Sequence, residues 1–165
     1  MILRSVLFAF FLWMFVAPSN GNEVIISVKI LNEGHSARLQ NAHVEITAEG
    51  TKPKKYAADS SGEISQINLE FNQQYVVRFM CRGYVSKLAW IDTRLAPDSL
   101  NELPENITLY QKMEVSLFKK APHQNLKFLK TEPMIKFKVD DEYLSFTWDT
   151  AYTNTMLKRV YEGRE

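Results

Sequence analysis

The sequence predicts an all-β fold, an antiparallel β-sandwich followed by a C-terminal β-hairpin and a short α-helix. Two observations support this prediction. Between residues 22 and 110, apolar side chains recur at every second position in several short runs, which is the period of strands that bury one face. Turn-forming residues separate these runs, and no helical period interrupts them, as is typical of sandwiches.

The first two strands are predicted at residues 24–30 and 42–48. One parity is apolar in each run, with Val24, Ile26, Val28 and Ile30 in the first and Ala42, Val44, Ile46 and Ala48 in the second. A polar segment containing Gly34 lies between the two runs and favours a loop. We therefore expect two half-buried strands here.

A short strand at residues 55–58 and a longer one at residues 64–71 flank a predicted tight turn. In this turn the Asp59 carboxylate can accept a bond from a downstream amide, and Gly62 can adopt a positive φ. The apolar alternation of the second strand breaks once between Ile64 and Ile67. This break predicts a β-bulge or a change of sheet.

Residues 74–82 predict the central strand. Its apolar parity contains Tyr75, Val77, Phe79 and Cys81. Gly83 then interrupts the run and frees the backbone, so that Tyr84 can fold back over the end of the sandwich. Residues 85–93 predict another strand, residues 94–105 an exposed loop, and residues 107–109 the beginning of a closing strand.

The C-terminal part, residues 113–165, begins with a polar connector and then predicts a hairpin. Residues 135–139 and 144–148 alternate like strands, and three acidic residues, 140–142, lie between them. Adjacent acids lack the alternating pattern of a calcium-binding loop. A solvated turn is therefore the preferred interpretation.

A short amphipathic helix is predicted after the hairpin. Tyr152, Met156 and Val160 recur every four residues, and Asp149 or Thr150 can cap the first turn. The apolar stripe of this helix covers either its own chain or a partner.

Residues 1–21 have the pattern of a secretory signal peptide. Arg4 precedes an uncharged apolar run at residues 6–17, and small residues suited to cleavage follow. An uncleaved anchor is the alternative, although the run is short for crossing a bilayer. We expect residues 22–112 to form the sandwich and residues 113–165 a C-terminal extension, with no membrane insertion after cleavage.

Charge and cysteine content limit the expected partners. Without Arg4 the chain has 19 basic and 19 acidic residues, so no surface for nucleic acid is expected. The basic residues Lys119, Lys120, Lys127 and Lys130 are interpreted as a solvated face rather than a site for anionic lipid. Cys81 is the only cysteine, which excludes an intramolecular disulfide. We expect it to be a small core residue, with a reactive or intermolecular thiol as the alternative.

Three segments together resemble a known family. They are residues 39–46 (LQNAHVEI), residues 58–64 (ADSSGEI) and residues 75–84, which begin YVV and end GY. This pattern is similar to that of carboxypeptidase-regulatory-like, transthyretin-like domains, which are seven-stranded prealbumin-type sandwiches of exported bacterial proteins. The resemblance covers residues 23–112 and implies fold-defining roles for Ala42, Asp59, Gly62, Tyr75, Gly83 and Tyr84. It implies no catalytic role, because such domains accompany enzymes or receptors.

No motif predicts catalysis, a metal site or a cofactor. His35, His43 and His123 are assigned to a loop, a strand face and the connector, and their spacing does not predict a zinc site. The Gly-x-Ser-x-Gly motif of serine hydrolases does not occur. A small hydrolase would need a deep pocket lined by acids or by a Ser/His pair, for which a sandwich of this size has little room.

Large aromatic side chains are frequent for a small neutral domain. Exposed rings can stack on sugars or anchor a protein partner, and packing in the core is the alternative interpretation. The candidate binding residues are Trp90, Trp148, Tyr152 and Met156.

We therefore expect an exported, non-enzymatic binding or assembly module of the bacterial cell envelope, periplasmic or associated with the outer membrane. A protein partner would bind at a sheet edge or at the C-terminal extension. A carbohydrate-binding module that uses exposed aromatic residues is the alternative.

Overall fold

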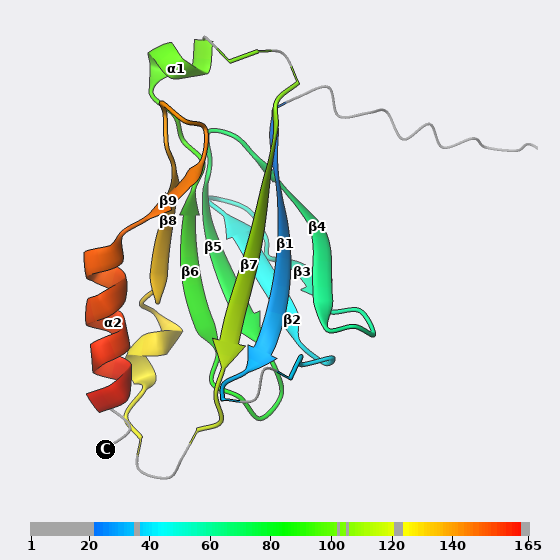
Figure 1. Cartoon of the computed structure of the whole chain (residues 1–165), viewed down its shortest axis with the longest axis vertical. Coiled ribbons are helices and arrows are strands. Elements are labelled where there is room, and N and C mark those ends of the chain that lie inside the picture. Colours follow the sequence, from blue (N-terminus) through cyan, green and yellow to red (C-terminus); the bar gives the residue numbers. More distant parts are fainter. Residues whose placement is uncertain (1–21, 35–36, 102, 105, 121–123, 163–165) are drawn as a thin grey trace, which may run out of the picture.

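The computed structural model describes residues 22–34, 37–101, 103–104, 106–120 and 124–162. The predicted signal peptide, His35 and His123 lie outside these residues. Two β-sheets face each other, and a C-terminal helix lies beside them (Figure 1). The prediction of an all-β sandwich with a C-terminal hairpin and a short helix is confirmed.

The first sheet has the strand order β4–β1–β7. Its strands are β1 (Glu23–Asn32), β4 (Glu63–Glu70) and β7 (Thr108–Leu117). The central strand β1 is antiparallel to β4 and parallel to β7. The sandwich is thus not purely antiparallel, because β1 and β7 belong to distant parts of the chain and no hairpin turn connects them.

The second sheet has the order β3–β2–β5–β6–β8–β9. Its strands are β2 (His43–Ala48), β3 (Lys54–Ala57), β5 (Gln74–Met80), β6 (Lys87–Asp92), β8 (Ile135–Val139) and β9 (Phe146–Trp148). Strands β1 to β7 form a seven-stranded sandwich. The predicted hairpin, β8 and β9, widens the second sheet through parallel pairing of β8 with β6.

The main core lies between the two sheets. Its buried residues come from the predicted apolar parities of β1, β2, β4 and β5, and it also includes Val139 of β8, which is fully buried. A second, smaller core contains Phe118, Leu126, Leu129, Met134, Met156 and Val160. The C-terminal extension therefore contributes to both cores.

The predicted irregularity in β4 is a β-bulge. Ile26 pairs with Ile67 and Val28 with Ile64, so two residues of β4 lie opposite one residue of β1. One of the two, Gln66, has a φ of 58°. The bulge restores the alternation on the core face, because Ile64 and Ile67 are both buried.

The turn before β4 has the predicted geometry. The Asp59 carboxylate accepts bonds from the Ser61 amide at 2.8 Å, the Ser61 hydroxyl at 2.7 Å and the Glu63 amide at 3.0 Å. The amide bond from Glu63 and the hydroxyl bond from Ser61 lower the pKa of Asp59. Gly62 adopts a φ of 73°, as the turn requires.

Two predicted element boundaries differ from the structure. β7 continues to Leu117, so the strand crosses the boundary expected at residue 112. The segment expected to be a loop contains a short helix, α1 (Pro97–Asn101).

The extension also contains a 3-10 helix, η1 (Lys127–Lys130), before β8, and ends with α2 (Thr150–Glu162). Within the described residues, no helix has the length and apolar character needed to cross a membrane.

Candidate binding groove along strand β7

Strand β7 is an edge strand, and its free edge faces the C-terminal extension. It lies at one end of its sheet and pairs only with β1 among the described strands. In Figure 1, the β8–β9 hairpin and α2 lie on the side of β7 away from β1. A free strand edge presents backbone donors and acceptors with which another strand can pair.

Hydrogen bonds at both ends of β7 identify the residues that face this edge. The Ile107 carbonyl accepts a bond from the Glu23 amide, and the Leu117 carbonyl accepts one from the Glu33 amide, each at 2.9 Å. In a parallel pair, alternate residues direct their backbone groups to the same neighbour, and the β1–β7 register has no shift. The odd-numbered residues therefore bond to β1. The even-numbered residues from Thr108 to Ser116 direct their backbone groups to the free edge.

A groove of about 480 Å³ runs along the free edge. Residues 111–116 line it consecutively, which indicates that the strand edge forms one wall, because successive side chains point to opposite faces of a sheet. The lining opposite β7 is mostly apolar and includes Leu88, Met134, Ile135, Phe137, Trp148 and Leu157. We call this space the β7 groove. Its volume lies in the range of ligand-binding clefts.

The register of β8 and β9 positions the aromatic part of the opposite wall. Phe137 lies opposite Ile91 of β6, and Trp148 lies opposite Phe137. Because Ile91 faces the core, this register extends the inner face of the sheet out to Trp148, which is 55% exposed. The Phe137 and Trp148 rings meet edge to face with centroids 6.5 Å apart. Trp148 therefore projects from the rim of the sandwich beside β7.

Helix α2 contributes Leu157 to the wall of the groove opposite β7. The Asp149 carboxylate caps the helix by accepting a bond from the Tyr152 amide at 2.9 Å. Met156 is buried in the second core, and its neighbour Leu157 lines the β7 groove. Arg159 donates two bonds to the Glu132 carboxylate, at 2.6 and 3.0 Å, which fixes the helix to the segment before β8 and lowers the pKa of Glu132.

Polar contacts already occupy part of the free edge of β7. The Lys87 ammonium donates to the Ser116 carbonyl at 2.5 Å, and the side-chain amide of Gln111 donates through Nε2 to the Lys112 carbonyl at 2.7 Å. Glu114 lies between these two contacts and directs its own backbone amide and carbonyl to the edge. Its side chain lies 3.7 Å from the Lys29 ammonium, on the outer face of the sheet. An incoming strand can thus pair first at Glu114.

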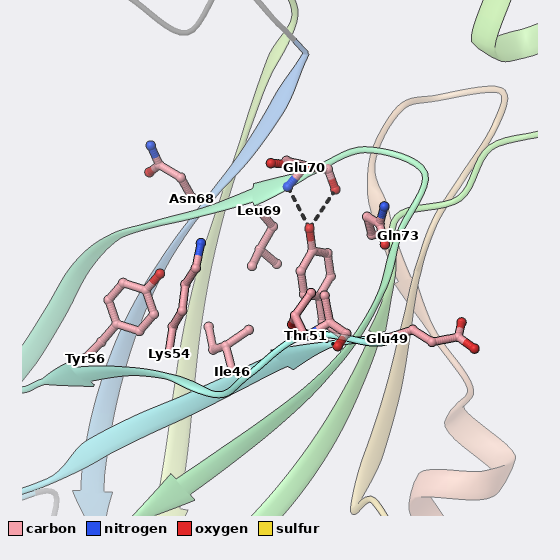
Figure 2. Close-up of a pocket in the computed structure, with 11 residues that line it drawn as sticks. Ile46, Glu49, Thr51, Lys54, Tyr56, Asn68, Leu69, Glu70 and Gln73 are labelled. Atoms are coloured by element: carbon pink, nitrogen blue, oxygen red, sulfur yellow. Dashed lines mark hydrogen bonds between the residues drawn. The ribbon is translucent and has the colours of Figure 1, made fainter. Parts of the chain in front are cut away.

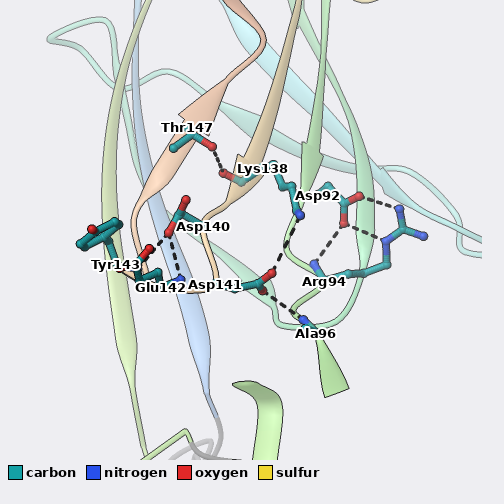
Figure 3. Close-up of polar contacts among 9 residues, drawn as sticks. All are labelled: Asp92, Arg94, Ala96, Lys138, Asp140, Asp141, Glu142, Tyr143 and Thr147. Atoms are coloured by element: carbon teal, nitrogen blue, oxygen red, sulfur yellow. Dashed lines mark hydrogen bonds and ion pairs between the residues drawn. The ribbon is translucent and has the colours of Figure 1, made fainter. Parts of the chain in front are cut away.

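Polar contacts hold the turn between β8 and β9 in place (Figure 3). The Asp140 carboxylate accepts bonds from the amides of Glu142 and Tyr143, both at 2.9 Å. The Asp141 carboxylate accepts a bond from the Ala96 amide at 3.0 Å and so holds the turn against the segment after β6. The predicted solvated hairpin turn at residues 140–142 is confirmed.

A smaller pocket of about 210 Å³ lies on another side of the sandwich, between the ends of β2 and β4 (Figure 2). Tyr75 reaches into it, and its hydroxyl bonds to the Glu70 amide at 2.8 Å and to the Glu70 carbonyl at 3.3 Å. Burial raises the pKa of Tyr75. The Thr93 hydroxyl donates to the same carbonyl at 2.8 Å. These bonds hold the connection between β4 and β5 in place. A role of Tyr75 in defining the fold would have this effect.

The structure separates the two tryptophans predicted to bind. Trp90 lies between Ala89 and Ile91, which are buried in the core, and therefore points to the outer face of the second sheet. Trp148 continues the inner face. The Lys136 ammonium lies 5.2 Å from the centroid of the Trp90 ring and 3.9 Å from that of Tyr152. Trp90 and Trp148 nevertheless both line a groove of about 490 Å³ at the β8–β9 edge of the second sheet, together with Lys136 and Asp149.

The other two candidate binding residues pack within the chain. Met156 is 1% exposed, so its assignment to a binding surface is wrong, and its apolar side chain instead anchors α2. Tyr152 is half-buried and donates its hydroxyl to the Pro133 carbonyl at 2.8 Å. The stripe of α2 thus covers its own chain, which was one of the two expected arrangements.

Cys81 lies just beyond β5 and is partly buried against the main core. Burial raises the pKa of its thiol, which disfavours the reactive thiolate. The next turn is closed by a bond from the Tyr84 amide to the Cys81 carbonyl at 3.1 Å, with Gly83 at a φ of 85°. Gly83 therefore has the turn geometry expected of it. Ala42, also predicted to define the fold, is 2% exposed.

Ser116 and Lys119 have the Ser-x-x-Lys spacing of some serine hydrolases. In β7 this spacing does not produce a helical turn, on which residues three apart share one face. The Lys119 ammonium lies 5.7 Å from the centroid of the Tyr84 ring, and the Ser116 carbonyl is bonded to Lys87. In the described part of the chain, no three His, Cys, Asp or Glu residues are grouped for metal binding.

The sequence did not indicate most residues of the β7 groove. Lys87, Gln111 and Leu157 have no unusual motif around them, and they meet only because β7, β6 and α2 converge. Leu157 lies outside the apolar stripe of α2, but a single exposed apolar residue is common on protein surfaces and did not by itself indicate the groove.

No family model matches the sequence, and no curated protein matches it. The resemblance to transthyretin-like domains therefore remains a prediction. Solved structures that are similar include the Bacillus anthracis TIE protein, with 18% identity and a TM-score of 0.44 over 59% of this chain and 17% of that chain. The group B streptococcus pilus 2b backbone protein matches with 15% identity and a TM-score of 0.38, over 59% of this chain and 41% of that one.

Catechol 1,2-dioxygenase from Acinetobacter sp. also matches, with 10% identity and a TM-score of 0.41 over 65% of this chain and 55% of that one. The chain thus spans less than two thirds of each of these three proteins. Matches of this strength do not indicate what this chain binds or catalyses. What is established is the architecture itself, a two-sheet β-sandwich extended by a hairpin and one C-terminal helix.

Proposed function

We propose that this chain is an exported, non-enzymatic binding module of the bacterial cell envelope, periplasmic or at the outer membrane. In this proposal an extended segment of a partner protein adds to β7 as a further strand. The observation that carries it is the coincidence of a free strand edge with an apolar groove along residues 111–116. Strand addition uses these two features, because the backbone supplies hydrogen bonds and pockets receive alternate side chains.

The C-terminal extension makes a single strand a better fit than another folded sheet. β8, β9 and α2 stand opposite the free edge and leave a groove of about 480 Å³. A second sandwich would have to bring its own sheet edge into this space. An extended segment needs only the width of one strand, about 5 Å in the hydrogen-bonding direction.

The carbohydrate alternative has less support. Trp90 and Trp148 both line a groove of about 490 Å³, but the strand alternation directs their side chains to opposite faces of the second sheet, so the two rings do not form one flat stacking platform. The face of Trp90 is in addition covered by the Lys136 ammonium. Binding of the mature protein to a glycan array that is lost in Trp148→Ala would restore this alternative.

A proline substitution tests strand addition directly. Glu114→Pro removes the amide that points to the groove and leaves the β1–β7 hydrogen bonds in place, as edge strands tolerate. Glu114→Ala is the matched control, because it removes the same side chain and retains the amide. A photo-crosslinking residue at Leu157 reports occupancy of the groove, and the same residue at Lys52 reports a distant surface.

We expect a discrete adduct from Leu157 in cells that express the chain, retained in Glu114→Ala and reduced at least about tenfold in Glu114→Pro. No adduct should form from Lys52. If Glu114→Pro folds normally and crosslinks as well as Glu114→Ala, no strand pairs with β7 and the proposal is wrong.

A further inference from the structure

Three backbone carbonyls of β7 point into the β7 groove, and side chains of the same chain already cover two of them. The three belong to the even-numbered residues of the lining segment, Lys112, Glu114 and Ser116. The side-chain amide of Gln111 bonds to the Lys112 carbonyl, and the Lys87 ammonium bonds to the Ser116 carbonyl. The Glu114 carbonyl has no donor among the described residues. An added strand therefore finds one open acceptor in this groove.

The cover over the Ser116 carbonyl is the firmer of the two. Its donor, the Lys87 ammonium, is charged and also lies 5.2 Å from the centroid of the buried Phe118 ring. Ser116 is half-buried, whereas Lys112 is exposed and is bonded to the neutral side chain of Gln111. A charged donor makes the stronger hydrogen bond, and the aromatic ring attracts the same ammonium. Lys87 is thus held in place by two separate contacts.

The other sheet edges among the described strands are short or irregular. β3 has four residues and follows Pro53, β9 has three residues, and β4 contains the bulge at Gln66. Such features keep unrelated strands from pairing with an edge. β7 has ten residues and a register with β1 that has no shift. At this long edge the two covered carbonyls restrict pairing instead, because an ordinary strand offers its neighbour an amide at every second residue.

The spacing of the covered carbonyls determines which amides of a bound segment have an acceptor. We call the residue whose amide bonds to the Glu114 carbonyl the central residue of the segment. In an antiparallel pair, the residues opposite Lys112 and Ser116 are two positions away from the central residue. In a parallel pair, the amides that would reach these two carbonyls also belong to the residues two positions before and two positions after it. For either strand direction, these two amides therefore meet carbonyls that are already bonded.

Given strand addition at β7, on which this inference rests, we propose that the occupant is an extended protein segment with proline two residues before and two residues after the central residue. Proline has no amide hydrogen, so it leaves no unpaired donor against a covered carbonyl, whereas other residues lose binding there. Proline also restricts its own backbone and that of the preceding residue to extended conformations, which reduces the entropy lost on binding. The central residue is not proline, because its amide bonds to the Glu114 carbonyl.

Four fluorescein-labelled peptides test this inference. The first has the sequence Lys-Thr-Pro-Val-Val-Val-Pro-Thr-Lys, in which both prolines lie two residues from the central valine. The second has valine in place of both prolines. The third retains the prolines and carries an N-methyl group on the amide of the central valine. The fourth carries the N-methyl group on the next valine, whose amide points away from β7, and is the matched control for the third.

With residues 22–165, we expect the proline-flanked peptide to bind about tenfold more tightly than the valine-flanked peptide by fluorescence anisotropy. The N-methyl group on the central amide should weaken binding by about tenfold or more, and the N-methyl group on the next amide should leave it unchanged. These comparisons use the unmodified protein and do not depend on the folding of a variant.

A variant of Lys87 tests the cause of the preference. Lys87→Met uncovers the Ser116 carbonyl and retains a side chain of similar length, so the preference for the proline-flanked peptide should fall to about threefold or less. Lys52→Met removes an exposed lysine that does not line the groove and should leave the preference unchanged.

Two outcomes separate this inference from the proposed function. If the valine-flanked peptide binds at least as tightly as the proline-flanked peptide, and the central N-methyl group still abolishes binding, strand addition stands and the proline preference is wrong. The side chains of Lys87 and Gln111 would then leave the carbonyls when a strand binds. If no peptide binds, or if the central N-methyl group has no effect, strand addition and the proline preference are both wrong.

Discussion

Two glycines with almost the same backbone conformation, Gly50 and Gly62, differ in their surroundings. Their φ angles are 72° and 73°, but a Cβ at Gly62 would lie 2.7 Å from the Arg38 Cβ, whereas nothing lies within 4 Å at Gly50. The cost of a positive φ for an L-residue, about 1–2 kcal/mol, applies to both. Only Gly62 adds the cost of a steric clash with another segment.

We therefore predict that Gly62→Ala destabilises the protein by about 1–3 kcal/mol more than Gly50→Ala does. Urea denaturation of the two variants and the parent gives the free energies of unfolding. Arg38 also donates to the Ser61 carbonyl at 3.2 Å, so the clash would weaken this contact as well. Equal losses in the two variants would mean that the Arg38 segment moves away freely.

At the residue scale, the sequence predicted those structural features that depend on residues close together in the chain. The Asp59 bonds, the positive φ of Gly62 and the bulge between Ile64 and Ile67 all follow from short-range geometry, and the structure confirms them. The contact of Gly62 with Arg38 joins residues far apart in the chain. Such a contact has no local signature, because it depends on how two connections pack.

The elements of the extension were predictable to different degrees. The hairpin and α2 follow clear periods of two and about four residues, and Asp149 caps the helix as expected. β7 was predicted only at its start, since polar residues such as Gln111, Lys112 and Glu114 obscure the alternation of Met113 with Val115. Lys112 and Glu114 are polar because their side chains lie on the solvent-exposed outer face of the sheet.

Adjacent residues of α2, Met156 and Leu157, should have separable effects. Met156 is 1% exposed in the second core, and Leu157 is 38% exposed in the β7 groove. We predict that Met156→Ala destabilises the protein by about 2–5 kcal/mol, as expected for a buried large-to-small change. Leu157→Ala should cost less than about 1 kcal/mol.

For binding, the substitution of Leu157 should have a larger effect than the substitution of Met156. Leu157→Ala removes a side chain that would contact the added strand, so we expect weaker crosslinking or peptide binding from a protein that is folded normally. Thermal melts followed by circular dichroism, with anisotropy titrations at a temperature where both variants are folded, measure the two effects. A large loss of stability in Leu157→Ala would assign this residue to the fold and not to the groove.

At the scale of the whole molecule, the features that the sequence did not predict depend on pairing between strands that are distant in the chain. The parallel register of β1 with β7 and of β6 with β8 brings segments together that no turn connects. Alternation identifies a strand and its buried face, but it does not identify the neighbouring strand. The β7 groove is a product of these two pairings, which is why only Trp148 among the four candidate residues chosen from the sequence lines it.

The same pairings make the extension part of the sandwich. Val139 of β8 is fully buried in the main core, and Met134 and Phe118 join the extension to the end of β7 in the second core. A separately folding appendage would have its own core and few contacts with the sandwich. We therefore predict that the sandwich and the extension unfold in one cooperative transition.

Trp90 and Trp148 can report this transition independently. Trp90 lies on β6, within the sandwich, and Trp148 lies on β9, within the extension. In residues 22–165 these are the only tryptophans, so Trp90→Phe and Trp148→Phe each leave one fluorescent reporter. We expect each variant's fluorescence and far-ultraviolet circular dichroism to give coincident urea midpoints, as a two-state transition requires. The prediction would be wrong if the Trp148 fluorescence gave a lower urea midpoint than the circular dichroism of the same variant. In that case the extension would open while the sandwich remained folded, and the wall of the β7 groove that the extension forms would be able to move.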